Sequence, residues 1–269
     1  MASKFIGITT AALLLVSGCA RTIDEKSALA GSITVAGSTS VQPISEVLAE
    51  HFTLTHPGVR INVQGGGSSG GIKAARELAA DLGASSRPLK PEEKGLHEFI
   101  IAWDGIAVIV HPTSPLRSLS LDEVKAVFAG SVVNWRGIGG PEGTIMVVTR
   151  EEGSGTRGAF EEIVMGKDPI TDRAIVLNST GAVAAAVAGD PLAIGYVSLA
   201  AVRPGIAALS IDGVMPSAEA IASGRYRIAR PFLYLTAAAP EGVVRAFLDF
   251  ILSPEGQAIV EREGLVPVN

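Results

Sequence analysis

Short apolar runs alternate with amphipathic helical segments along the chain, and this pattern constrains the fold more than any other feature. The runs at residues 33–36, 106–110 and 145–149 have the length and composition of buried strands. From Ile44 to Phe52, apolar residues recur at i, i+3, i+4 and i+8, which is one face of a helix. Strands that alternate with helices form mainly parallel sheets covered on both faces, so we predict an α/β fold. A chain of 269 residues is too long to form only one small sheet, which favours two similar lobes.

The N-terminus has the pattern of an export signal. Lys4 precedes an apolar run at residues 6–16, which is much shorter than the ~20 residues of a membrane span. The run ends at Ser17-Gly18-Cys19, which resembles a bacterial lipobox. We predict a lipoprotein signal peptide over 1–18, lipidation of Cys19 and a tether over 19–31. The alternative is an ordinary secretory signal in which Cys19 is incidental, and both interpretations place the protein outside the cytoplasm.

Composition excludes several classes of function. Cys19 is the only cysteine, so none remains for a disulfide or for thiolate metal ligation. The chain has no clustered metal-ligand motif, and we predict neither a metal nor a cofactor. A net charge of −5 and 5% aromatic residues argue against a nucleic-acid partner. An acidic total still permits an anionic ligand, because a site can be built from local donors.

Three turns rich in Gly, Ser and Thr each follow a predicted strand and precede a predicted helix. They occupy residues 36–40, 65–71 and 150–156, and Arg150 begins the third. The first N–H groups of a helix lack internal partners and carry about half a unit of positive charge, which suits an oxyanion. Each turn alone could be a capped helix start, since Ser and Thr are favoured N-caps. Three together favour one shared anion site at the carboxyl ends of the strands.

Enzyme motifs in the same residues are incomplete. Residues 65–70 fit G-x-G-x-x-G, but no acidic residue stands about twenty positions on, as a dinucleotide site requires. Residues 66–70 also fit the G-x-S-x-G of a hydrolase, for which His97 and His111 are the downstream histidines. We predict that the protein is not an enzyme, and a secreted serine hydrolase or phosphatase is kept as an alternative.

From about residue 33 to 268 the chain resembles the phosphate-binding proteins of bacterial ABC phosphate importers, the PstS type. The segments that carry the resemblance are residues 37–43, 67–71, 81–87, 104–108, 134–135, 150–157, 193–196 and 252–257. The resemblance implies a type II periplasmic-binding fold with two α/β lobes and phosphate in the cleft between them. It implies lobe I at 32–110 plus 204–269, lobe II at 111–203, and crossings near 104–110 and 202–205.

The resemblance also implies partners and a mechanism. Inorganic phosphate would be captured by closure of the lobes and passed to the permease subunits of an ABC importer. The protein would be a monomer, anchored by lipid on the outer side of a membrane. A binding protein or sensor for another tetrahedral oxyanion is the second alternative.

Transferred by position, the ligand-binding residues would come from all three turns and from the segment after residue 84. They are Thr39, Ser40, Ser68, Ser86, Arg87, Arg150, Glu152, Ser154, Gly155 and Thr156. Arg87 would be a second cation in the site, or would pair with Asp81 or Glu92 on the surface. We expect Glu152 to orient Arg150.

Ser86 is a departure from the family. Well-studied members have a carboxylate at this position, which accepts the proton of hydrogen phosphate. Such an acceptor separates phosphate from sulfate, because a site built to bond a hydroxyl rejects an analogue that lacks it. Here the acceptor would be Glu152 or the Ser86 oxygen, and we expect Glu152.

Overall fold

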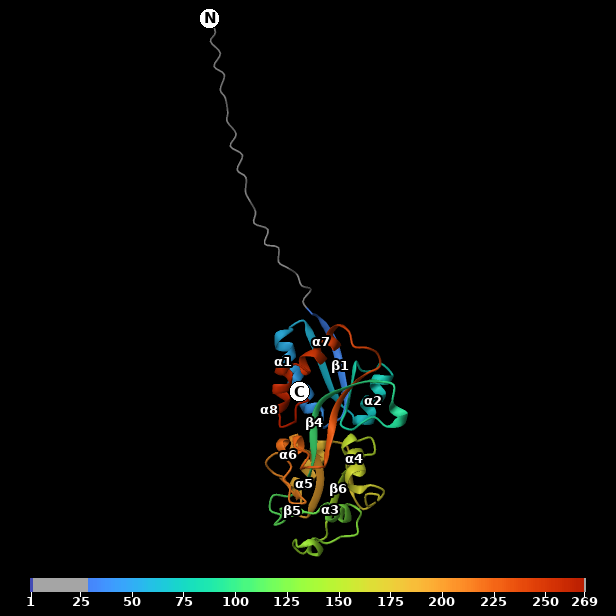
Figure 1. The fold of residues 1–269 in the computed structure, drawn as a ribbon, viewed down its shortest axis with the longest axis vertical. Coiled ribbons are helices and arrows are strands. Elements are labelled where there is room, and N and C mark those ends of the chain that lie inside the picture. Colours follow the sequence, from blue (N-terminus) through green and yellow to red (C-terminus); the bar gives the residue numbers. More distant parts are fainter. Residues whose placement is uncertain (2–28, 269) are drawn as a thin grey trace.

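The computed structural model describes Met1 and residues 29–268, which form two α/β lobes (Figure 1). One mixed sheet runs through both lobes in the order β2-β1-β3-β11-β4-β8-β6-β7, with β9 paired to β4. This confirms the predicted α/β class. The predicted signal peptide, the lipidation at Cys19 and nearly all of the tether lie outside the described residues.

The first lobe, which includes α1, α2, α7 and α8 in Figure 1, is built on three parallel strands and one antiparallel strand. Its elements are β1 (Gly31–Gly37), α1 (Gln42–Thr55), β2 (Val59–Gly65), α2 (Ser68–Arg76), β3 (Leu82–Ser85), a 3₁₀ turn η1 (Pro91–Glu93), β11 (Ala229–Thr236), α7 (Gly242–Ile251) and α8 (Pro254–Arg262). The predicted helical face is confirmed, because Ile44, Leu48 and Phe52 are buried against Phe247. These apolar contacts fix the start of α1, and with it the turn that precedes the helix.

The second lobe has its own core around three aromatic rings. The Phe160 and Tyr196 rings stack with centroids 4.1 Å apart, and Phe128 packs edge-on at 4.7 Å from Phe160. The elements of this lobe are β5 (Ser118–Leu119), α3 (Leu121–Phe128), η2 (Trp135–Ile138), β6 (Met146–Arg150), α4 (Gly155–Phe160), a π-helical turn η3 (Glu161–Met165), β7 (Ile175–Leu177), α5 (Thr180–Gly189), β8 (Ala193–Ser198), η4 (Leu199–Ala201), β9 (Ala207–Ala208), β10 (Ser210–Ile211) and α6 (Ala218–Ala222).

Two strands connect the lobes. β4 (His97–Val110) pairs with β11 up to Gly105 and with β8 from Ile106 onward, so the first crossing lies within the expected segment. The return crossing does not lie at 202–205. Leu209 and Tyr226 are buried in the core of the second lobe, and the chain re-enters the first lobe on β11. Residues 207–228 therefore belong to the second lobe, which corrects the boundary placed at residue 204.

Among the described residues, no helix combines the length and the apolar character needed to cross a membrane.

Candidate functional site

The three Gly/Ser/Thr turns meet where the two lobes touch. The first turn contacts the third through Ser40 Oγ and Thr156 Oγ1, which are 2.9 Å apart. The second turn contacts the third through Ser69, whose backbone N–H donates to the Gly153 carbonyl at 3.1 Å. β1 and β2 of the first lobe run in one direction and β6 of the second lobe runs in the other. The carboxyl ends of these strands therefore face each other across the interface, which brings the turns together. The expected convergence of the turns is thus present.

Helix capping does not account for the hydroxyl groups of the first two turns. α1 follows Val41 and α2 follows Gly67, and neither helix start has a side-chain cap. Of the three turns, only the third has a side-chain cap: Ser154 Oγ accepts from the Arg157 N–H at 3.2 Å. The hydroxyls of Thr39, Ser40 and Ser68 instead lie at the interface between the lobes.

Arg150 is the charged group at the centre of this cluster. Its side chain is only 2% exposed at the end of β6. Nε and Nη2 donate to the two carboxylate oxygens of Glu151, both at 2.9 Å, and Nη1 donates to Thr180 Oγ1 at 3.3 Å. A guanidinium has five N–H donors, and the described residues accept three of them. The other two are available to an anion.

Glu151, not Glu152, orients Arg150, which corrects the sequence prediction. Both oxygens of the Glu151 carboxylate accept hydrogen bonds from the Arg150 guanidinium, and the carboxylate also lies close to Gly67 of the second turn. Glu152 is exposed at the surface. The prediction failed because both glutamates lie in the turn after β6, and the sequence does not say which carboxylate turns back to Arg150.

Ser86 lies in a buried chain of serine hydroxyls. Ser38 Oγ donates to Ser86 Oγ at 2.9 Å, and Ser68 Oγ accepts from the Ser86 N–H at 3.1 Å. Ser68 Oγ and Ser86 Oγ are 3.4 Å apart. Gly155 of the opposite lobe packs against both residues, because a Cβ on Gly155 would lie 2.7 Å from Ser86 Oγ. Ser86 therefore stands at the contact between the lobes, beside Ser68.

Arg87 is buried and already paired. Its Nη1 and Nη2 donate to the Glu93 carboxylate at 2.6 and 2.7 Å, and Nη2 also donates to Ser69 Oγ at 3.2 Å. These bonds lower the pKa of Glu93 below its ordinary value of 4.5. The prediction that Arg87 pairs with Asp81 or Glu92 was wrong, because its partner is Glu93. Arg87 supports the second turn from behind, and its charge is balanced by Glu93.

Sequence reasoning missed Thr180. It begins α5, and its Oγ1 lies 2.8 Å from Ser40 Oγ, 3.3 Å from Thr39 Oγ1 and 3.3 Å from Arg150 Nη1. Thr180 thus joins a turn of one lobe to the arginine of the other. The signal was present, since residues 175–181 repeat the strand, hydroxyl and helix pattern a fourth time.

A buried ion pair lies beneath the site on the two crossing strands. Arg230 donates to Asp104 Oδ2 from Nε at 3.2 Å and from Nη2 at 3.0 Å, and both side chains are fully buried. Arg230 also donates to the Ser86 carbonyl, and Ser198 Oγ donates to Asp104. Burial raises the pKa of Asp104 and lowers the pKa of Arg230, and their contact opposes both shifts. The pair links the crossing strands to the floor of the site.

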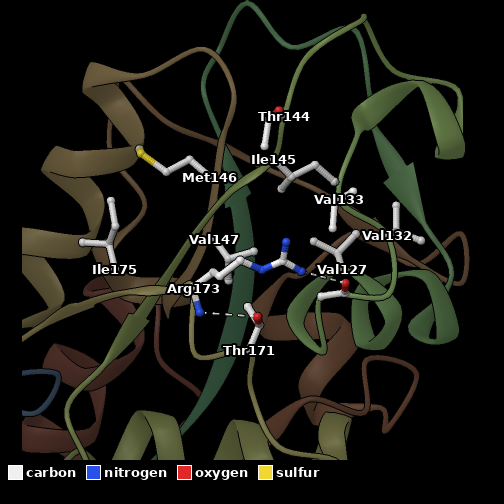
Figure 2. A pocket seen from close by; sticks show the side chains of 11 residues that line it. Val127, Val132, Val133, Thr144, Ile145, Met146, Val147, Thr171, Arg173 and Ile175 are labelled. Carbon is white, nitrogen blue, oxygen red and sulfur yellow. Dashed lines mark hydrogen bonds between the residues drawn. The ribbon is translucent and has the colours of Figure 1, made fainter.

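The cavity in Figure 2 is separate from this cluster. It has a volume of about 290 Å³, lies in the second lobe and is lined mainly by aliphatic side chains such as Val127, Val133 and Ile175. Its arginine, Arg173, donates to the Gly130 carbonyl at 3.3 Å. None of the predicted ligand-binding residues lines it.

The cluster at the interface offers neither a metal site nor a catalytic pair. Among the described residues, no group of three His, Cys, Asp or Glu side chains could hold a metal ion. In the same part of the chain, the hydrogen-bonded histidine side chains contact Val47, Phe52, Thr55 and Thr113, not a serine. The arrangement suits the binding of an anion by neutral donors and one guanidinium.

Two lobes that meet at a hydroxyl-rich and arginine-containing interface define a solute-binding protein of the periplasmic type, and comparison with known proteins agrees. Residues 22–255 match the family described as PBP superfamily domain. The phosphate-binding protein PstS of Bacillus subtilis is 34% identical over 245 residues, which cover 88% of this chain and 81% of that protein.

Two solved structures are also similar. A putative phosphate ABC transporter substrate-binding protein from Clostridium perfringens, with bound phosphate, is 41% identical with a TM-score of 0.86. The match covers 89% of this chain and all of that one. An ABC-type phosphate transport receptor from Vibrio cholerae is 33% identical with a TM-score of 0.73, over 87% and 99% of the two chains. The chain belongs to the PBP superfamily and, within it, to the PstS-type phosphate-binding proteins.

Proposed function

We propose that this chain is an extracytoplasmic binding lipoprotein that captures inorganic phosphate between its lobes and delivers it to an ABC permease. The observation that supports this function is the buried Arg150, which bonds to Thr180 and through it to the Ser40 hydroxyl of the other lobe. The resemblance to phosphate-binding relatives supports the choice of ligand. No bond is made or broken.

The proposed ligand shell combines one guanidinium with neutral donors from both lobes. Its members are Thr39, Ser40, Ser68, Arg150, Ser154, Gly155, Thr156 and Thr180. Arg87 supports this shell from behind through Ser69, whereas Ser86 lies beside it at the contact between the lobes, bonded to Ser68. A buried anion is stable only when each oxygen is hydrogen-bonded, and donors from both lobes meet that condition only when the lobes are closed.

Export and anchoring complete the proposal. A signal peptide over 1–18 and a lipid on Cys19 would hold the protein at the outer face of a membrane, beside the permease. The permease would recognise the closed form, because only that form presents both lobes in a fixed relation. Mass spectrometry of the mature N-terminus after expression in a lipoprotein-processing host tests the anchor.

Calorimetric titration of refolded, phosphate-free protein tests the ligand. We expect saturable binding of phosphate, and we expect sulfate and molybdate to compete only weakly with phosphate for the site. Arg150→Met removes the guanidinium, and loss of a buried charged partner costs about 2 kcal/mol or more, so affinity should fall at least about 30-fold. Arg173→Met removes an exposed arginine of the same lobe and serves as the control. Equal affinities of both variants, or tighter binding of another oxyanion, would contradict the proposal.

A further inference from the structure

A second cavity at the lobe interface adjoins the hydroxyl cluster. Its volume is about 240 Å³, and Thr39, Ser40 and Thr180 belong to both its wall and the proposed ligand shell. The rest of its lining comes from both lobes and consists of Pro43, Ile44, Gly181, Ser198, Ala200, Ala201, Arg203, Glu263 and Leu265. This cavity therefore shares part of its wall with the residues that would hold an anion.

The lining suits a short aliphatic group. Pro43, Ile44, Ala200, Ala201 and Leu265 form an apolar surface that would bury methylene groups favourably. The charged side chains of Arg203 and Glu263 also line the cavity. Arg203 is exposed to solvent and donates to the Ala200 carbonyl at 2.6 Å, which places its guanidinium beside η4.

A thin wall of hydroxyls separates this cavity from Arg150. Thr180 Oγ1 bonds to Ser40 Oγ at 2.8 Å and to Thr39 Oγ1 at 3.3 Å, and Arg150 Nη1 donates to the same Thr180 oxygen. These hydroxyls satisfy one another in this structure. An anion bound at Arg150 would accept hydrogen bonds from these hydroxyls, and the bonds between them would then be replaced by bonds to the ligand.

We propose that the site also binds monoesters of phosphate with short aliphatic alcohols, with the alkyl group in this cavity. A monoester keeps three terminal oxygens, which the guanidinium and the turns would hold as they hold inorganic phosphate. The ester oxygen would face the Thr39–Thr180 wall, and the carbon chain would lie against Ile44 and Ala201. This inference rests on the proposed function, because it uses the same anion site.

Gly181 provides a selective test. It lines the cavity in the first turn of α5, its φ is not positive, and a Cβ built on it meets no atom within 4 Å. Gly181→Leu would therefore narrow the cavity without disturbing the fold. Gly189→Leu is the matched control, because Gly189 lies in the same helix, its Cβ is equally unobstructed, and it does not line the cavity.

The probes are n-butyl phosphate and inorganic phosphate, titrated calorimetrically into each phosphate-free protein. We expect n-butyl phosphate to bind the unmodified protein and to compete with phosphate. Gly181→Leu should lower the affinity for n-butyl phosphate at least about tenfold, which corresponds to about 1.4 kcal/mol, and should change the affinity for phosphate less than about twofold. Gly189→Leu should change neither.

Two results would overturn the inference while the proposed function stands. In the first, phosphate binds but n-butyl phosphate does not compete. In the second, Gly181→Leu weakens both ligands equally. Absence of binding by both ligands to the unmodified protein would overturn the proposed function as well.

Discussion

At Gly155 the two lobes approach too closely for a side chain. A Cβ there would clash with Ser68 Oγ and would lie 2.7 Å from Ser86 Oγ and 2.9 Å from Ser68 Cβ. All of these atoms belong to the first lobe, whereas Gly155 begins α4 of the second. Its φ is not positive, so alanine fits the backbone. Gly155→Ala should therefore leave each lobe intact and obstruct only their contact.

The size of the effect follows from the contact. Forcing an extra methyl into a close-packed site costs about 1–3 kcal/mol. An open form does not carry this clash, so the whole cost would appear as lost ligand affinity, about 5-fold to 150-fold. The closed form should also be less compact, because the lobes must separate to admit the methyl group.

Calorimetry with phosphate and small-angle scattering of the saturated protein would measure both quantities. Gly153→Ala is the control, because it lies in the same turn and its Cβ would meet Ser69 Cβ at an ordinary 3.8 Å. We expect Gly153→Ala to bind like the unmodified protein. Matching affinities and radii of gyration for the two variants would refute the argument that closure brings Gly155 against Ser68.

Three further predictions follow from the contacts around Arg150, Arg87 and Ser86. Glu151→Gln weakens two charge-assisted bonds from Arg150, so the free energy of unfolding should fall by about 1–3 kcal/mol in urea titration. The control, Glu152→Gln at an exposed position, should change it by less than about 0.5 kcal/mol. A larger loss of stability in Glu152→Gln would show that Glu152 orients Arg150. The lowered pKa of Glu93 stabilises the fold above pH 4.5, so the stability difference between the unmodified protein and Glu93→Gln should shrink as the pH falls below that value, and a difference that grows with acid would contradict the pairing with Arg87. Ser86→Asp should increase the preference for phosphate over sulfate at neutral pH, and an unchanged ratio of the two dissociation constants would count against a role for position 86 in selectivity.

The sequence was sufficient for the parts of the fold that depend on periodicity. The face from Ile44 to Phe52 predicted α1, and the position of each turn after a strand predicted their convergence. The return crossing was missed because residues 207–228 form very short elements, β9, β10 and α6, whose burial in the second lobe depends on tertiary packing. No periodic pattern distinguishes such a segment from a crossing.

Side-chain partners were harder to predict than positions. The sequence placed Arg150 beside two glutamates, and only the path of the chain after β6 decides that Glu151 turns back toward it. Arg87 pairs with Glu93 because the chain turns back at η1, which spacing alone does not indicate. Thr180 could have been found, since it repeats the hydroxyl pattern of the other turns.

Selectivity for hydrogen phosphate depends on an acceptor for its proton, and the neighbouring carboxylates are engaged. Glu151 gives both oxygens to Arg150, Glu93 gives both to Arg87, and Asp104 accepts from Arg230 and Ser198. Among the described residues of the proposed shell, the ligand proton would therefore meet hydroxyl oxygens.

The direction of the hydroxyl chain then decides which oxygen can accept. The Ser40 N–H donates to Ser38 Oγ at 3.2 Å, so Ser38 directs its own proton to Ser86. Ser86 in turn can direct its proton toward Ser68, which leaves a lone pair on Ser86 Oγ to accept the proton of the ligand. A hydroxyl that faces sulfate can rotate and donate instead, whereas a carboxylate cannot. Discrimination in this site is therefore expected to be weaker than with a carboxylate, and it depends on the backbone amide of Ser40 to hold the chain of protons in one direction.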